Sequence, residues 1–274
     1  MKQVTNNVYV ETGYRGCNPG FVITSSGVVM VDTPQRPSDA LLYKTEIEKL
    51  GKIVYLINTE PHGDHFAGNF FFNVPCISHQ GTREVIEQAS LGQLKERLGL
   101  IDPEYAPMLS SYEIHLPNIT FTRSMKLYVG EHTFEIINLP GHTVSETAVF
   151  VPQERIVFTG DNIFHGVQTF LHEAVPNEWL NSLEYLKKLD VDTFIPGHGE
   201  ICSEEYLDEQ ALFIKEWIAV VKDAIKKGWS LEESREGISL LHRYPMSDGM
   251  EDFGPELQKM NVSRLYSLIT SGQL

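Results

Sequence analysis

Residues 58–65 hold the densest group of side chains in the sequence that could do chemistry. Glu60, His62, Asp64 and His65 lie within six positions, directly after a short apolar run. In an extended segment, alternation places Glu60, His62 and Asp64 on one side, and His65 follows on the turn. Carboxylates and imidazoles gathered after an apolar strand are typical of a divalent-metal site. The simpler alternative, a polar loop with two solvated histidines, leaves this crowding unexplained.

Three further candidate ligands lie far along the chain, and each follows a predicted strand and a glycine. They are His142 after Gly141, Asp161 after Gly160, and His198 after Gly197. Side chains just past strand ends can converge at one edge of a sheet, and glycine lets the backbone turn closely around a buried ion. With the first cluster they supply four imidazoles and three carboxylates. This number suits two divalent ions about 3.5–4 Å apart.

Predicted strands and helices must position these side chains. Apolar runs bounded by turn residues predict strands at 8–10, 20–24, 27–32, 53–57, 74–79, 126–129, 133–138, 148–151, 156–158 and 193–195. Ser38 is the expected N-cap of a helix through Leu50 that Gly51 stops, and a second helix begins near Thr82. Leucines at helical spacing predict an amphipathic helix over 177–189.

Two stretches depart from this pattern of strands and helices. Residues 91–118 combine leucines with prolines, and we predict a helical excursion that either overhangs a pocket or packs on the surface. Residues 203–274 show apolar positions at helical spacing, and Ser230 with Glu233 forms a capping box. We therefore predict a sheet domain over 1–202 and a helical extension over 203–274. We expect this extension either to cover part of the sheet domain or to form a lid or a dimer surface.

Composition narrows the class of partner. The 274 residues carry a formal net charge of −15. Such an acidic surface repels phosphodiesters and anionic lipid headgroups, so we expect neither nucleic acid nor membrane partners. Cys17, Cys76 and Cys202 are odd in number and far apart, which argues against a disulfide framework. We see no long apolar segment and no secretion signal, and we expect a cytoplasmic protein with a small-molecule substrate.

Four motifs, taken in order, resemble those of the metallo-β-lactamase superfamily of metal-dependent hydrolases. They are Asn58-Thr59-x-x-His62-x-Asp64-His65, Pro140-Gly141-His142-Thr143, Thr159-Gly160-Asp161 and Pro196-Gly197-His198-Gly199. The resemblance covers roughly residues 1–200 and implies a four-layer α/β fold, an αββα sandwich with two metal ions at one edge between the sheets. It also implies the ligands: residue 60, His62 and His142 for the first ion, Asp64, His65 and His198 for the second, and Asp161 bridging both.

Glu60 stands where the family's usual motif begins with histidine. If Glu60 is a ligand, two divalent ions, three carboxylates and a bridging hydroxide sum to zero charge, whereas a histidine would leave one positive charge. A less positive site shifts the preference toward harder ions. We therefore expect two zinc ions first, with manganese or iron as alternatives. In the other interpretation, Glu60 points away and the first site is weakened or empty.

The resemblance implies a hydrolase in which water activated between two metal ions attacks a carbonyl carbon. We expect it to cleave an ester, thioester, lactone or amide-like bond of a small molecule. The expected catalytic residues are Asp64, Asp161 and His165, of which His165 could contact the substrate or donate a proton. Three alternatives stay open: a β-lactamase, a glyoxalase-II-like thioesterase, and a metal-binding sensor or interaction protein with little turnover. The C-terminal helices could also form a homodimer.

Overall fold

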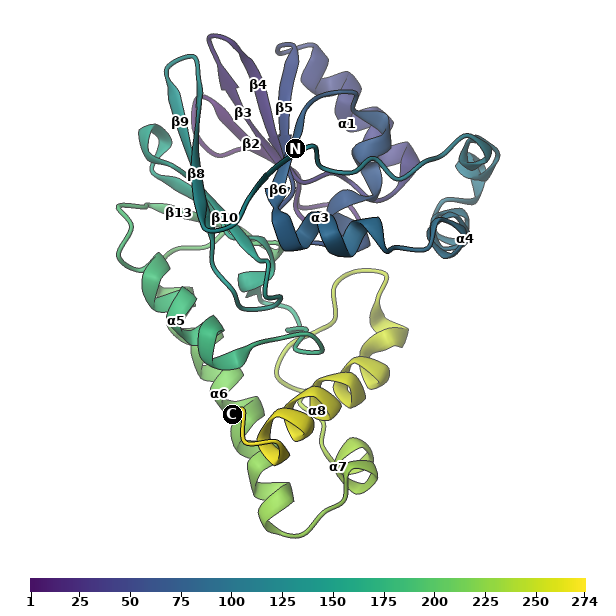
Figure 1. Cartoon of the computed structure of the whole chain (residues 1–274), viewed down its shortest axis with the longest axis vertical. Helices are drawn as coiled ribbons and strands as arrows, with labels where there is room; N and C mark the ends of the chain where they lie inside the picture. The colour runs from purple at the N-terminus through teal and green to yellow at the C-terminus, as the bar shows by residue number, and fades with distance from the viewer.

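Two β-sheets packed face to face form the centre of the computed structural model, which describes residues 1–274 (Figure 1). The first sheet holds seven strands in chain order, antiparallel from β1 to β4 and parallel from β4 to β7. Its strands are β1 (Lys2–Gln3), β2 (Val8–Val10), β3 (Gly20–Thr24), β4 (Gly27–Val31), β5 (Ile53–Ile57), β6 (Cys76–His79) and β7 (Ile119–Phe121).

The second sheet has the strand order β13-β11-β10-β9-β8. Its strands are β8 (Ser124–Val129), β9 (His132–Asn138), β10 (Thr147–Val151), β11 (Ile156–Phe158) and β13 (Thr193–Ile195). Only the pairing of β11 with β13 is parallel within this sheet. Two short strands that were not predicted, β12 (Phe164–His165) and β14 (His198–Gly199), form a separate parallel pair.

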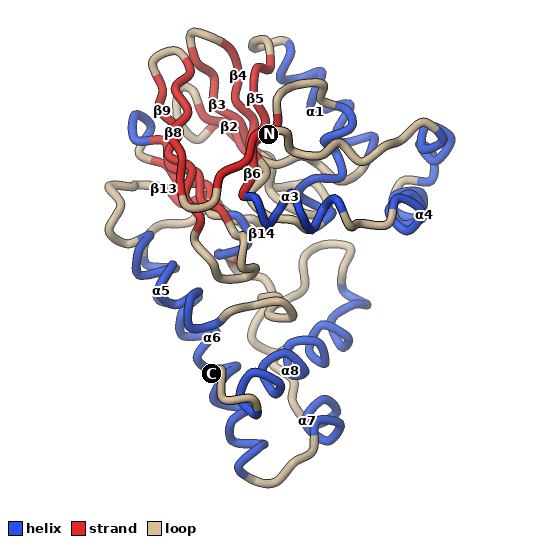
Figure 2. The backbone as a smooth tube through the Cα atoms, viewed as in Figure 1, coloured by secondary structure: helices blue, strands red, loops and turns tan.

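Apolar side chains from both sheets meet in a central core. Val29 and Ile57 come from the first sheet, and Ile136 and Phe158 come from the second. The outer face of the first sheet packs against α1 (Pro37–Glu48). The outer face of the second sheet packs against α5 (Pro176–Leu186), α6 (Glu205–Lys226) and α8 (Gly254–Thr270). Helices therefore lie outside both sheets (Figure 2), which confirms the predicted αββα sandwich.

Local sequence signals predicted ten of the strands to within two residues, but one helix start was wrong. The helix expected from Ser38 begins at Pro37 instead, and Ser38 is not its N-cap. The Ser38 N–H donates a hydrogen bond of 2.8 Å to Oδ2 of Asp102, 64 residues further along the chain. A distant carboxylate thus satisfies a free amide of the first turn, which local sequence patterns do not reveal.

The excursion at 91–118 is helical only in its first part. It contains α4 (Leu91–Ile101) and a 3-10 segment, η2 (Pro103–Ser110), and residues 111–118 lead to β7 without a helix. Leu98, Leu109 and Tyr112 form a small buried cluster with Ala67, and the Tyr112 hydroxyl donates to the Ala67 carbonyl oxygen at 2.8 Å. Since Ala67 directly follows α2 (Gly63–Phe66), the excursion is anchored beside the loop that carries the candidate ligands.

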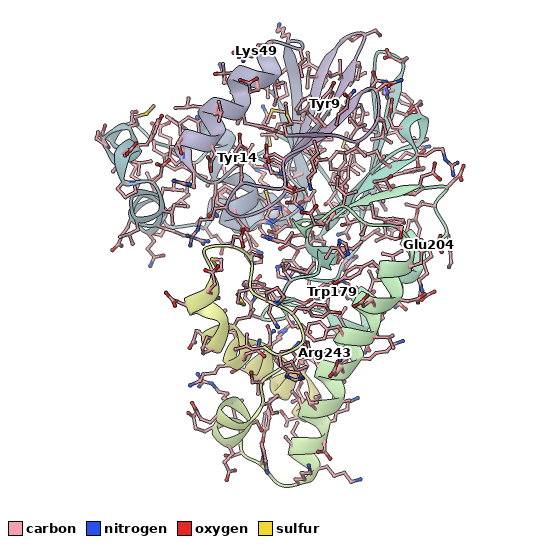
Figure 3. The ribbon with its side chains drawn as sticks, turned by 180° about the vertical axis from the view of Figure 1, so that it is seen from behind. Tyr9, Tyr14, Lys49, Trp179, Glu204 and Arg243 are labelled. Atoms are coloured by element: carbon pink, nitrogen blue, oxygen red, sulfur yellow. The ribbon has the colours of Figure 1, made fainter.

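Residues 203–274 contain helices and no strand, as predicted. Besides α6 and α8 they form α7 (Leu231–Gly237), whose predicted capping box between Ser230 and Glu233 is confirmed. One buried cluster behind the second sheet includes residues of α5, α6 and α8, so α6 and α8 share one core with α5. Trp179 of α5 lies fully buried within that cluster (Figure 3). No helix is both long and apolar enough to cross a membrane.

Candidate active site

All seven candidate ligands lie just past strand ends, and the fold brings them together at one edge of the sandwich. The extended segment predicted through Asp64 is wrong in its second half, because Asp64 and His65 lie in the short helix α2. Glu60, His62, Asp64 and His65 follow β5, while His142, Asp161 and His198 follow β9, β11 and β13. Glu60 and His65 are completely buried. The loops converge because β4 to β6 are parallel and β11 is parallel to β13.

Glu60, His62 and His142 form the first group of potential metal ligands. Nδ1 of His62 lies 2.6 Å from Oε2 of Glu60 and 3.2 Å from Nε2 of His142. Glu60 therefore faces the other members of its group, and the interpretation in which it points away does not describe this structure.

Asp64, His65 and His198 form the second group. Nε2 of His198 lies 3.3 Å from Oδ2 of Asp64. Asp161 lies between the two groups: its oxygens are 3.3 Å from Nε2 of His65, 3.4 Å from Nε2 of His198 and 3.7 Å from Nε2 of His142. Glu60 also reaches the second group, because its Oε1 lies 3.2 Å from Nε2 of His65.

Several buried atoms at this place lack a hydrogen-bond partner, and these atoms test whether the residues suit metal ions. They include Oε2 of Glu60, Nε2 of His65 and Oδ1 of Asp161, each of which faces another candidate ligand at 2.6–3.3 Å without forming a hydrogen bond to it. A buried polar atom without a partner is costly, and most are paired in folded proteins. Carboxylate oxygens and imidazole nitrogens are ordinary ligands of divalent cations. The residues therefore fit a centre for divalent ions, which would satisfy these atoms.

The electrostatics of the cluster also favour cations. Burial alone would lower the pKa of His198, but Asp161 and Asp64 raise it to about 10. The pKa of Asp64 is held well below its usual range, although burial opposes this, because His198 and His65 lie beside it. Surrounding carboxylates thus draw a proton to the His198 imidazole, and a metal ion would compete with that proton for the same nitrogen. Burial instead lowers the pKa of His142 to about 3, which keeps that imidazole neutral and its nitrogen available to a metal ion.

Asp32 orients one of these ligands, and sequence reasoning missed it. Its carboxylate accepts hydrogen bonds from the Thr59 N–H at 2.8 Å, the Thr59 hydroxyl at 2.6 Å and Nδ1 of His65 at 2.9 Å. The last bond leaves Nε2 of His65 free to face the cluster. Asp32 holds a left-handed backbone conformation (φ 57°). The available signal was its position directly after a strand, which it shares with the predicted ligands.

His142 is oriented in a similar way by the chain around it. Its Nδ1 donates to the carbonyl oxygen of Phe170 at 2.7 Å, so its Nε2 faces Asp161 and His62. The ring of Trp179 lies beside it, with ring centroids 6.0 Å apart, and the indole N–H donates to the Asn162 carbonyl oxygen at 3.0 Å. Contacts of this kind fix the ring rotation and tautomer of a metal-binding histidine.

Glycine is required at all three predicted positions, and a Cβ on Gly141 would overlap Oδ1 of Asn162. A Cβ on Gly197 would overlap Oδ1 of Asp161, and a Cβ on Gly160 would overlap Oε1 of Glu146. Gly160 also has a φ of +53°, which favours glycine. That Glu146 oxygen accepts the Asp161 N–H at 2.9 Å, and it is a second buried acid that the sequence did not single out.

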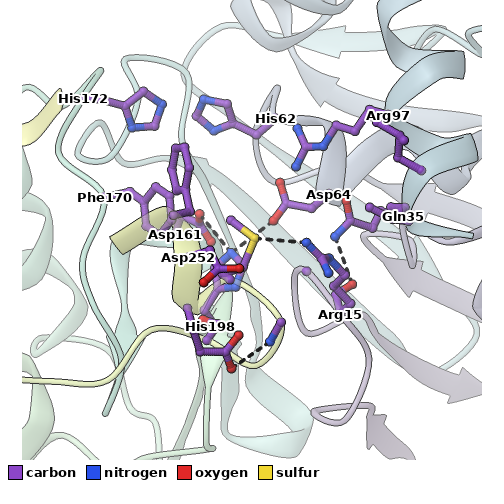
Figure 4. A pocket seen from close by; sticks show the side chains of 18 of the residues that line it. Arg15, Gln35, His62, Asp64, Arg97, Asp161, Phe170, His172, His198 and Asp252 are labelled. Atoms are coloured by element: carbon purple, nitrogen blue, oxygen red, sulfur yellow. Dashed lines mark hydrogen bonds and ion pairs between the residues drawn. The ribbon is translucent and has the colours of Figure 1, made fainter. Parts of the chain in front are cut away.

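A cavity of about 760 Å³ opens above the cluster. We call the seven candidate ligands the floor of this cavity; five of them line it, and Glu60 and His65 lie buried among these five. Two segments, 93–101 in α4 and 247–253 before α8, line it from outside the sandwich, and we call them the rim. The excursion at 91–118 therefore borders a pocket, which is the first of the two arrangements considered for it. His172 and Phe170 lie on one side of the floor, and Arg15, Gln35 and Arg97 lie on the other (Figure 4).

The role predicted for His165 does not agree with its position. His165 does not line the cavity. Its Nδ1 donates to the carbonyl oxygen of Glu200 at 2.7 Å, and its ring packs edge-on against Tyr206 with centroids 4.3 Å apart. The turn after Asp161 directs His165 into the β12–β14 pair, so we assign it no part in the reaction. His172 borders the floor instead, with its ring 5.3 Å from that of His62.

The chain resembles known proteins over most of its length. A family model described as the metallo-beta-lactamase superfamily matches residues 12–198. A metallo-beta-lactamase type 2 from Elizabethkingia meningoseptica is 24% identical over 215 residues, which are 73% of this chain and 78% of that protein. The solved structure of a metallo-beta-lactamase family protein from Thermus thermophilus covers 98% of this chain and 95% of that one, with a TM-score of 0.70 and 16% identity, which shows a shared fold.

A shorter match involves a protein described as a hydroxyacylglutathione hydrolase, from Bartonella quintana. It is 34% identical over 87 residues, which are 32% of this chain and 32% of that protein. The match therefore spans about a third of the length of this relative.

Proposed function

The chain belongs to the metallo-β-lactamase superfamily of metal-dependent hydrolases, and we propose that it cleaves a thioester or ester bond of a small molecule. The observation that carries this proposal is the convergence of the seven floor residues beneath a cavity, with buried ligand atoms that form no hydrogen bond. The match to a hydroxyacylglutathione hydrolase supports the thioester, because a hydroxyacyl group on glutathione is bonded to sulfur. The cavity volume is in the range that suits a small-molecule ligand.

We propose a role for each residue of the floor. Glu60, His62 and His142 would hold one ion, Asp64, His65 and His198 the other, and Asp161 would contact both. Divalent ions bound there would supply a water of lowered pKa and an electrophile for the carbonyl oxygen. The surrounding residues orient these ligands, because Asp32 and the Phe170 carbonyl fix two of the imidazoles. Besides holding an ion, Asp64 would accept a hydrogen bond from the attacking water.

The metals themselves are part of the proposal. Zinc is the first candidate, and Glu60 supports manganese or iron as alternatives because it adds a carboxylate to the site. We also keep the cytoplasmic location and a homodimer through the C-terminal helices as predictions. Leu212 on α6, 63% exposed, is an apolar side chain that such a dimer could cover, and light scattering in solution would test it.

Turnover by metal-loaded protein tests the proposed function. Protein loaded separately with Zn²⁺, Mn²⁺ or Fe²⁺ would be offered matched thioesters, oxygen esters, lactones and a chromogenic cephalosporin. We expect thioesters or esters to be hydrolysed fastest, with activity lost on chelation and restored by metal. Fastest turnover of the cephalosporin would favour a β-lactamase. Protein that holds both ions and turns over none of these compounds would contradict the proposal and favour the sensor alternative.

A further inference from the structure

Two arginines form a cationic side of the cavity next to the floor. We propose that Arg15 and Arg97 are a binding site for a carboxylate of the substrate, so that the preferred substrate is a thioester or ester that carries a carboxylate away from the scissile bond. This inference rests on the proposed hydrolase function and adds the substrate's chemical class. Both side chains line the cavity, and both lie on the side of Asp64 in Figure 4.

Arg97 reaches the floor from α4. A Cβ built on Gly63, the residue between His62 and Asp64, would lie 3.9 Å from Nη1 of Arg97. The guanidinium therefore stands directly beside the loop that carries four floor residues, although Arg97 itself belongs to the exposed rim. Leu98, the next residue, is buried in the cluster that anchors the excursion, which fixes this turn of α4.

Arg15 approaches the same place from the loop between β2 and β3. Its carbonyl oxygen accepts a hydrogen bond of 3.2 Å from the side-chain amide of Gln35. Its neighbour Gly16 is so close to Asp64 that a Cβ there would lie 2.9 Å from the Asp64 Cβ. The guanidinium extends under the rim, where Nη2 lies 3.5 Å from Sδ of Met250. The backbone of Arg15 is thus fixed to the floor while its charge faces the cavity.

Neither guanidinium forms an ion pair within the chain. Arg36, Arg83, Arg155, Arg235 and Arg243 all form ion pairs with carboxylates. Arg15 and Arg97 form none, although acids outnumber Lys and Arg by 37 to 22. Glu96, Glu251 and Asp252 also line the cavity. Glu251 is the nearest of these acids in effect: hydrogen bonds from its own N–H and from the Gly249 N–H lower its pKa, and the charge of Arg15 adds a smaller contribution. No ion pair joins any of the three acids to either arginine.

A carboxylate is the ligand that this arrangement suits. A guanidinium binds a carboxylate through two parallel hydrogen bonds, with specificity that a single ammonium does not give. A chain with a net charge of −15 repels anions at long range, so an anionic substrate needs local cations to enter. With one end on the arginines, the substrate carbonyl would be directed toward the floor.

Binding of unreactive acids tests this site independently of turnover. The probes are straight-chain dicarboxylates of four to six carbons and monocarboxylates of the same length, titrated calorimetrically into metal-loaded protein. One carboxylate of each probe imitates the hydrolysis product at the floor, and only a dicarboxylate has a second group for the arginines. We expect at least one dicarboxylate to bind about tenfold tighter than its matched monocarboxylate.

Variants separate the local site from general charge effects. Arg97→Gln and Arg15→Gln should each reduce that preference to near unity, and Arg97→Lys should keep part of it. Arg123→Gln is the matched control, because Arg123 also has no ion pair and does not line the cavity; it should leave the preference unchanged. Equal affinity for both acids in the native protein, or equal loss in Arg123→Gln, would overturn the inference.

A kinetic comparison distinguishes failure of this inference from failure of the proposed function. Native protein should hydrolyse the mono-4-nitrophenyl ester of glutaric acid with a KM about tenfold below that of 4-nitrophenyl pentanoate, and Arg97→Gln should remove the difference. Hydrolysis of both esters with equal KM would refute the carboxylate site and leave the hydrolase intact. No hydrolysis of either ester, with a clear dicarboxylate preference in calorimetry, would refute the hydrolase and leave the site intact.

Discussion

The floor and the rim of the cavity are built in opposite ways. On the floor, Glu60 and His65 are completely buried, and backbone or side-chain partners fix the rings of His65 and His142. On the rim, Leu100 is 75% exposed and Arg97 forms no ion pair. The floor is held by the sandwich, whereas the rim comes from an excursion and from the C-terminal extension. We infer that the floor determines the kind of reaction and the rim determines which substrate reaches it.

The largest effect should follow from Asp161→Asn on the floor. Asp161 contacts imidazoles of both groups, and loss of its charge removes several kcal/mol of electrostatic stabilisation. We expect kcat/KM to fall about a thousandfold or more, together with the metal content. Asp190→Asn is the control, because 81% of the Asp190 side chain is exposed. Full activity in Asp161→Asn would remove the distinction between floor and rim.

Asp32→Asn should have the next largest effect. Asparagine tolerates the left-handed backbone of Asp32, so the variant should fold, but its amide no longer provides a carboxylate for Nδ1 of His65. We expect metal affinity to fall about 10- to 100-fold in competition with a chelator. Asp102→Asn removes an equally buried carboxylate that caps α1, and it should lower stability without this loss of affinity. An equal loss of affinity in both variants would contradict the role of Asp32.

Glu60→His tests whether the carboxylate of Glu60 sets the metal preference of the floor. Replacing the carboxylate with an imidazole removes one negative charge and adds a softer ligand. We expect zinc affinity to rise by about tenfold and the affinity for Mn²⁺ to fall. Competition titrations with both metals measure this change in preference. Unchanged zinc affinity would count against the charge argument.

A rim substitution should change substrate binding and leave the reaction rate nearly intact. Phe253 stacks on Phe170 with ring centroids 6.3 Å apart, which joins the rim to the loop that orients His142. We expect Phe253→Ala to raise KM by about threefold to tenfold, because one aromatic contact is lost. Tyr128→Ala removes an aromatic side chain that is 71% exposed on β8, and serves as the control. A large fall in kcat would show that the rim takes part in the chemistry.

Glu154 lies outside both the floor and the rim, and its substitution should affect stability but not activity. Burial alone would raise the pKa of the Glu154 carboxyl, but hydrogen bonds from His132, Thr5 and Asn7 lower it. A carboxyl with a lowered folded-state pKa stabilises the protein above its unfolded pKa, and this stabilisation is lost as pH falls through the folded-state value. We expect Glu154→Gln to cost about 1–2 kcal/mol at pH 7 in urea unfolding, a cost that shrinks below about pH 4. A fall in kcat/KM would contradict this separation.

The sequence predicted the floor better than the rim, for a physical reason. A ligand that directly follows an apolar strand has its position set by the sheet, so residues such as His142 and Asp161 could be assigned from local patterns. Asp32 obeys the same rule but was missed, because one acid at a strand end does not stand out without a histidine nearby. His165 was assigned too readily, since proximity in sequence to Asp161 does not determine which way the turn directs it.

The rim depends on contacts that no local pattern encodes. Asp102 in the excursion caps α1, and Arg15 contacts Met250 across 235 residues. The helices of the C-terminal extension were predicted, but the segment 247–253 borders the cavity only because α8 packs with α5 and α6 in one core. Where a helix lies over a site is decided by such packing, and the substrate therefore could not be read from the chain.

The most direct test of the central claim is a crystal structure of the metal-loaded protein, with anomalous scattering to identify each ion. We predict two ions on the floor, one held by Glu60, His62 and His142 and the other by Asp64, His65 and His198, with Asp161 contacting both. A single ion, or ions bound only elsewhere, such as at His172 and Glu173, would contradict the account.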